Sequence, residues 1–169
     1  MMKKILITLF LLILPSVANA GCDDPIGDGV DYTNCRFSDG QDLKASFLPN
    51  SNLSFASFIQ VNFDKSIMMN SILAYGIFSE STFIRANLYE SNLQGANFEK
   101  SDFTSANLTR AKFIGATLIE VNFQNANLIE SDFSFANITN ANFDGANLNN
   151  ATWTDGSKCG KGSIGVCKK

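Results

Sequence analysis

The sequence predicts an all-β solenoid, a square-sided β-helix of about five to six coils. Two observations indicate it. Large apolar residues occupy every fifth position from Leu43 to Trp153, with no insertion or deletion in the frame. From Ser46 onward, a small residue or valine stands two positions before each of them. This spacing fits neither the period of about 3.6 residues of a helix nor the period of 2 of a half-buried strand.

A period of five requires a chain that turns a corner in every repeat and points the central apolar residue inward. Four such repeats close a square, so that one coil takes 20 residues and coils stack at the usual strand spacing of ~4.8 Å. Residues 20 apart then lie above one another, and like residues stack on like. One such column reads Leu43, Phe63, Phe83, Phe103, Phe123 and Phe143.

The first 20 residues are interpreted as a signal peptide. Lys3 and Lys4 form a short positive region, residues 5–14 form an apolar run, and Ala18-Asn19-Ala20 offers small residues for cleavage between Ala20 and Gly21. The apolar run is shorter than the ~20 residues that cross a bilayer. We therefore expect an exported protein, periplasmic or extracellular, with no transmembrane span in the mature chain.

Cys22 offers an alternative, because Gly21-Cys22 resembles the end of a lipobox and Cys22 would then carry a lipid. Asn19 stands where a lipobox normally has leucine, which disfavours this alternative. The mature chain is expected to contain an N-terminal cysteine cap at 21–40, the repeats at 41–155 and a C-terminal cysteine loop at 156–169.

The four cysteines flank the repeats and indicate disulfides in an oxidising compartment. Three pairings are possible. Cys22–Cys35 and Cys159–Cys167 are favoured because the two ends of the rod lie roughly 26 Å apart, whereas a disulfide holds its Cα atoms within ~7 Å. A zinc site is the competing interpretation, disfavoured by the absence of histidine and of close CxxC pairs.

Composition argues against several function classes. The formal charge is −3 and becomes more negative when Lys3 and Lys4 are removed, so no basic patch for nucleic acid is expected. The chain has no histidine, no phosphate-binding glycine loop and no nucleophile elbow. We therefore expect no catalytic, cofactor or metal residues and no enzymatic activity.

Charged residues 20 apart are expected to form ion pairs across coils, each worth ~0.2–1 kcal/mol. One column holds Glu90, Arg110 and Glu130. A second holds Glu80, Lys100 and Glu120.

One stretch departs from the pattern. Ile67, Ile72 and Ile77 occupy outward positions that elsewhere hold Asn, Asp or Thr, with Phe47 stacked on Ile67 and Phe55 on Tyr75. Exposed apolar groups on adjacent coils can mark a contact surface for a partner or a dimer. Cover by the N-terminal cap and a local bulge are the alternatives. The candidate partner surface, called the apolar belt below, comprises Phe47, Phe55, Ile67, Ile72, Tyr75 and Ile77.

Segments such as Ala126-Asn127-Leu128 and Ala146-Asn147-Leu148 resemble the A(D/N)LXX motif of the pentapeptide-repeat family, and the resemblance covers residues 41–155. It implies a right-handed quadrilateral β-helix. The cysteine-bearing flanks are similar to those of exported members. The best-known members act on DNA gyrase as acidic dimers that resemble duplex DNA.

This chain differs from those members in its export signal, its C-terminal cysteine loop and its mixed surface charge. The function we expect is therefore that of an exported, non-catalytic scaffold for an unknown protein or envelope ligand. A DNA mimic that binds a topoisomerase, or a lipoprotein tethered through Cys22, are the alternatives.

Overall fold

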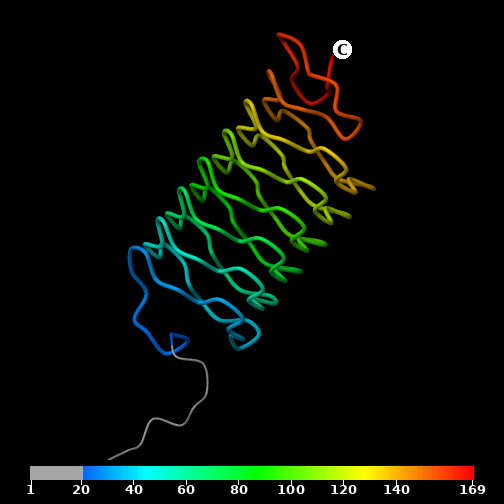
Figure 1. The fold of residues 1–169 in the computed structure, drawn as a ribbon. Coiled ribbons are helices and arrows are strands. Elements are labelled where there is room, and N and C mark those ends of the chain that lie inside the picture. The colour runs from blue at the N-terminus through cyan, green and yellow to red at the C-terminus, as the bar shows by residue number, and fades with distance from the viewer. Residues whose placement is uncertain (1–20) are drawn as a thin grey trace, which may run out of the picture.

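A computed structural model describes residues 21–169, and the predicted signal peptide and most of its cleavage site lie outside the described residues. The chain winds into a right-handed quadrilateral β-helix, which confirms the predicted fold class (Figure 1). Residues 21–169 contain no helix, and each repeat contributes a single residue in a parallel β-bridge rather than an extended strand. Bridges join residues 20 apart from Asp42↔Asn62 to Asp132↔Thr152.

Backbone hydrogen bonds explain why the coils stack at this register. The central residue of a repeat donates its N–H to the coil above, as Phe63 does to the Thr82 carbonyl at 2.7 Å. Thr82 donates back to the Val61 carbonyl at 3.0 Å. The small residue closes the corner, as Ser66 N–H does by donating to the Phe63 carbonyl at 3.0 Å. Most of the backbone polar groups are thus paired, as a narrow solenoid requires.

The residue before each centre is usually Asn or Asp because its side chain completes the turn. The Oδ1 atom of Asn62 accepts the N–H of Asp64 at 2.9 Å, and that of Asp102 accepts the N–H of Thr104 at 2.8 Å. Such side-chain turns are a property of short Asn and Asp side chains. From Leu43 to Leu148, the second residue after each centre forms the corner and has a positive φ, near 60°.

The core is a set of stacked aromatic columns filled out by Leu and Ala. Phe103 is fully buried, with ring centroids 4.6 Å from Phe83 below and 5.4 Å from Phe123 above. Ile138 and Trp153 also pack on the core but remain partly exposed. They lie in the last coil, part of which carries no further chain above it.

Serine replaces alanine in several of the small inward positions. The hydroxyl groups of Ser71, Ser81, Ser91 and Ser101 each donate to a carbonyl of the coil below at 2.6–2.8 Å. Ser66 is equally buried, yet its hydroxyl has no hydrogen-bond partner among the described residues.

Both ends of the rod are closed by disulfide-bonded segments, as predicted. Cys22–Cys35 and Cys159–Cys167 are bonded, with Cα–Cα distances of 5.5 and 4.9 Å. At the N-terminal end the ring of Phe37 stacks on the first core ring, Phe58, at 4.2 Å. The bridges of the cap join residues 21 apart, so this first coil contains one residue more than the coils of the repeats.

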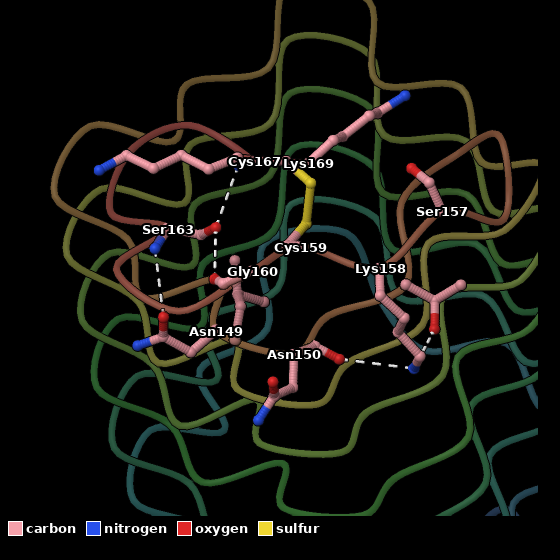
Figure 2. The surroundings of a disulfide bond; sticks show 12 residues. Asn149, Asn150, Ser157, Lys158, Cys159, Gly160, Ser163, Cys167 and Lys169 are labelled. Atoms are coloured by element: carbon pink, nitrogen blue, oxygen red, sulfur yellow. Dashed lines mark hydrogen bonds between the residues drawn. A yellow bond between two sulfur atoms is a disulfide. The ribbon is translucent and has the colours of Figure 1, made fainter.

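The C-terminal loop folds back over the last coil in the antiparallel sense, with bridges Asn147↔Ile164 and Thr152↔Lys158. Figure 2 shows how it is held. Ser163 donates its N–H to the side-chain oxygen of Asn149 at 3.1 Å, and its hydroxyl donates to the Gly160 carbonyl at 2.8 Å. The disulfide and these bonds keep the loop on the end of the rod and shield that part of the edge from pairing with other chains.

Candidate interaction surface

The apolar belt lies on the outside of the rod. Its six residues are 37–57% exposed, and none of them contributes to the buried core. Phe47 pairs with Ile67 through a β-bridge, and Phe55 stacks on Tyr75 with ring centroids 5.3 Å apart. Both of these predicted contacts are confirmed.

The structure removes two of the three interpretations of the belt. Ile67, Ile72 and Ile77 bridge to residues 20 positions earlier and 20 positions later, so the chain has no bulge here. Their exposure shows that the N-terminal cap does not cover them. The belt is thus exposed apolar surface on regular coils.

The three isoleucines also lose a hydrogen bond that their neighbours make. One coil further on, the Oδ1 atom of Asn92 accepts the N–H of Gln94 at 3.1 Å. Ile72 occupies the equivalent position and has no acceptor to offer. A typical hydrogen bond contributes about 0.5–1.5 kcal/mol, so three successive repeats forgo a modest stabilisation and expose apolar surface as well.

Phe135 was missed at the sequence level and, within residues 21–169, is the most exposed large apolar residue, at 83%. It is a corner residue, two positions after the buried Phe133, with φ of 61°. Because it follows Tyr75 by 60 residues, it lies on the same edge of the rod as Phe55 and Tyr75. The signal was present in the sequence: an aromatic residue at a corner, where the fold requires no side chain.

The first predicted charge column forms. Arg110 lies between two carboxylates, with Nε 2.7 Å from Oε2 of Glu130 and Nη1 3.1 Å from Oε1 of Glu90. The Tyr89 hydroxyl donates to Glu90 at 2.8 Å. The Tyr89 hydroxyl and then Arg110 hold the pKa of Glu90 below its ordinary value. The hydrogen bonds that Arg110 donates to Glu130 and then to Glu90 raise the pKa of Arg110.

The second predicted column does not form. Lys100 Nζ lies 3.8 Å from its sequence neighbour Glu99 and within 4 Å of neither Glu80 nor Glu120. Glu80 instead accepts a hydrogen bond from Gln60 Nε2 at 2.9 Å. A lysine side chain is long and strongly hydrated, so stacking register alone does not determine its partner.

The described residues offer little for chemistry. Between positions 21 and 169 no three His, Cys, Asp or Glu side chains are grouped so that they could hold a metal ion. All four cysteines are in disulfides, which excludes the competing zinc interpretation. Over the same part of the chain, no helix is long and apolar enough to cross a membrane.

Comparison with known families agrees with this repeat geometry. Residues 76–153 match the model of the pentapeptide repeat region, and residues 42–73 match a model of eight pentapeptide repeats. The chain belongs to the pentapeptide-repeat family. No curated protein sequence matches it.

Solved structures of other pentapeptide-repeat proteins are similar to this one. Rfr23 of the cyanobacterium Cyanothece 51142 is 25% identical with a TM-score of 0.47, over 73% of this chain and 90% of that one. The plasmid-mediated fluoroquinolone resistance protein QnrB1 is 19% identical with a TM-score of 0.43, over 75% and 69%. A protein of the Arabidopsis thaliana thylakoid lumen is 21% identical with a TM-score of 0.40, over 71% and 70%.

Proposed function

We propose that this pentapeptide-repeat protein is an exported, non-catalytic interaction protein that binds a protein or envelope ligand through the apolar belt. The observation that carries the proposal is the outward placement of Ile67, Ile72 and Ile77. Three successive repeats replace a turn-forming polar residue by an exposed isoleucine, on a rod whose other outward positions are mostly polar. A ligand that covers the belt would remove this apolar surface from water.

Two features support a non-catalytic role. General acid–base catalysis needs carboxylates in a concave site that excludes water. In this protein Glu90 and Glu130 lie on an outer wall with side chains 40% and 43% exposed, and both are paired to Arg110.

The two alternative functions receive less support. In the column of Glu90 and Glu130 the intervening Arg110 interrupts the run of negative charge that a DNA mimic would present. The sulfur of Cys22 is bonded to Cys35, and a lipoprotein anchor would need the same atom for its thioether link.

The experiment combines localisation with binding. Cell fractionation of the full-length chain should place a processed form outside the cytoplasm. The purified mature protein should then bind an isolated cell-envelope preparation, and Ile72→Asp should weaken that binding at least tenfold. Light scattering on both proteins shows whether the belt instead joins two copies of the chain.

Asn92→Asp is the matched control, because it places the same charge one coil away in the same column and keeps the acceptor for Gln94. It should bind as the unchanged protein does. If Ile72→Asp alters neither envelope binding nor molecular mass, the belt is not an interaction surface. If the protein is found unprocessed in the cytoplasm, the exported role is wrong.

A further inference from the structure

The four edges of the rod differ in the residues at their corners. Three edges carry charged side chains at some of their corners, for example Lys65 and Arg85 on one, Glu90 and Arg110 on the next, and Glu80 and Lys100 on another. The remaining edge has no charged corner from Phe55 to Phe135, and the next position in its column, Asp155, is ion-paired to Lys169. Its corner residues are Phe55, Tyr75, Gly95, Gly115 and Phe135.

The aromatic residues on this edge do not serve the fold. Phe55, Tyr75 and Phe135 have φ of 59–61°, a left-handed conformation that glycine or asparagine adopts at lower cost. Their side chains are 50–83% exposed and stand outside the core. The repeats impose this conformation on other corner residues too, but exposed aromatic rings on neighbouring coils, such as Phe55 and Tyr75, can mark a contact surface.

The two glycines shape the edge between the rings. A Cβ atom on Gly95 would lie 2.5 Å from Cε1 of Tyr75, so the tyrosine ring rests directly on the Gly95 backbone. Its hydroxyl accepts a hydrogen bond from Gln94 Nε2 at 3.2 Å, which holds the ring there. A Cβ on Gly115 would meet nothing within 4 Å. The edge therefore has a low section at Gly115, between the rings of Tyr75 and Phe135.

Uncharged residues flank the corners along the whole edge. The flank before the corners reads Ser54, Ala74, Gln94, Ile114 and Ser134, and the flank after them reads Ser57, Ile77, Asn97, Thr117 and Asn137. Asn97 and Asn137 use their oxygens to accept the N–H groups of Glu99 and Thr139, at 2.9 and 3.1 Å. Within residues 21–169 their Nδ2 atoms donate to no acceptor, and so remain available to a ligand.

We propose that this edge, called the aromatic strip, binds a neutral linear polysaccharide. A sugar ring presents an apolar C–H face, which stacks on an aromatic ring, and hydroxyl groups at its rim, which both donate to and accept from amides and hydroxyls. The charge pattern suits such a ligand, because the five corners from Phe55 to Phe135 carry no ionic group and the Asp155 carboxylate beyond them is paired to Lys169. A linear polysaccharide also repeats one sugar ring every few ångströms along its length, which suits a rod whose coils repeat every ~4.8 Å.

A proline-rich peptide is the other ligand that favours aromatic surfaces, and it binds in aromatic-lined grooves. It offers backbone carbonyl acceptors but no regular donors. The strip has hydroxyl and amide oxygens along both flanks, which favours a ligand that donates as well as accepts. This inference rests on the proposed function, since Phe55 and Tyr75 belong to both the belt and the strip, and it extends the surface to Phe135.

The test is affinity electrophoresis and pull-down of the mature protein with a panel of cellulose, chitin, soluble β-glucan and amylose. Anionic polygalacturonate and an oligoproline peptide serve as the contrasting probes. The unchanged protein should bind at least one neutral polysaccharide. Phe55→Asn and Phe135→Asn should each weaken that binding roughly tenfold, the value of one aromatic stacking contact of about 1.4 kcal/mol.

Asparagine tolerates the corner conformation, so both variants should keep their thermal midpoint and show that folding is intact. Lys100→Asn, at the corner of another edge, is the matched control and should leave binding unchanged. The proposal is overturned if no neutral polysaccharide binds, if both aromatic variants bind normally, or if the oligoproline peptide is the ligand.

The outcomes separate the two proposals. If Ile72→Asp abolishes envelope binding while the polysaccharide panel fails, the belt stands as an interaction surface and the ligand class proposed here is wrong. If a polysaccharide binds through Phe135 while Ile72→Asp has no effect on envelope binding, the strip stands and the belt proposal fails.

Discussion

Replacing Phe103 by Ala tests the physical basis of the fold most directly. The ring is fully buried, stacked between Phe83 and Phe123 at 4.6 and 5.4 Å, and meets Phe98 edge to face at 5.2 Å. Truncating a buried Phe costs about 3–5 kcal/mol through lost transfer free energy and the remaining cavity. Each aromatic contact adds about 0.5–1.5 kcal/mol. We expect the upper half of the range.

The cavity should remain largely open, because hydrogen bonds between coils hold the rings above and below in place. Denaturant unfolding of the oxidised protein, followed by circular dichroism and by Trp153 fluorescence, gives the change in the free energy of unfolding. Coincident curves would support a two-state comparison. Phe135→Ala removes the same atoms from an exposed corner and should change stability little. An unfolding midpoint of Phe103→Ala equal to that of the unchanged protein would refute the argument that the central residues carry the fold.

Three further predictions use the same measurements. Ser66→Ala removes a buried hydroxyl without a partner and should raise the thermal midpoint, whereas Ser101→Ala removes a satisfied one and should lower stability by about 1 kcal/mol. Cys167→Ser opens a short loop and should cost roughly 2–3 kcal/mol locally, measured as faster hydrogen exchange in the last coil. The pKa of Glu90 is lowered in the folded protein, so its ionised carboxylate stabilises the fold at pH values above the ordinary glutamate pKa. This stabilisation disappears as the pH falls through the lowered pKa of the folded protein. Glu90→Gln should therefore lower the thermal midpoint near neutral pH and leave it unchanged in strong acid.

The coil architecture could be predicted because one residue in five carries it. A single five-residue frame points Leu43, Phe103 and Trp153 toward the core. Once four repeats close a square, the same frame also determines which residues pair between coils. The disulfides could be predicted from the length of the rod, because both other pairings would have to bridge its two ends.

The failures lie where register does not determine a contact. Lys100 was expected to pair across coils, but its long side chain reaches Glu99 equally well. The antiparallel return of the C-terminal loop onto Asn147 and Thr152 could not be predicted, because the five-residue period ends before it. Phe135 was missed because no aromatic residue lies one coil away from it in its column, whereas Phe55 and Tyr75 mark each other by stacking.

The corner is where this fold can acquire function at least cost. A residue such as Phe135 makes no contact that the core requires, and its backbone conformation is imposed by the repeat, whichever side chain is present. Substitution at a corner therefore changes the surface of one edge and leaves stacking intact, whereas substitution at Phe103 would damage the coil. The aromatic corners are therefore positions where the polysaccharide proposal can be tested without damage to the core. Selection for folding alone would favour glycine or asparagine at such corners, and the Phe135→Asn variant measures this directly: its stability should equal or exceed that of the unchanged protein while its binding is weakened.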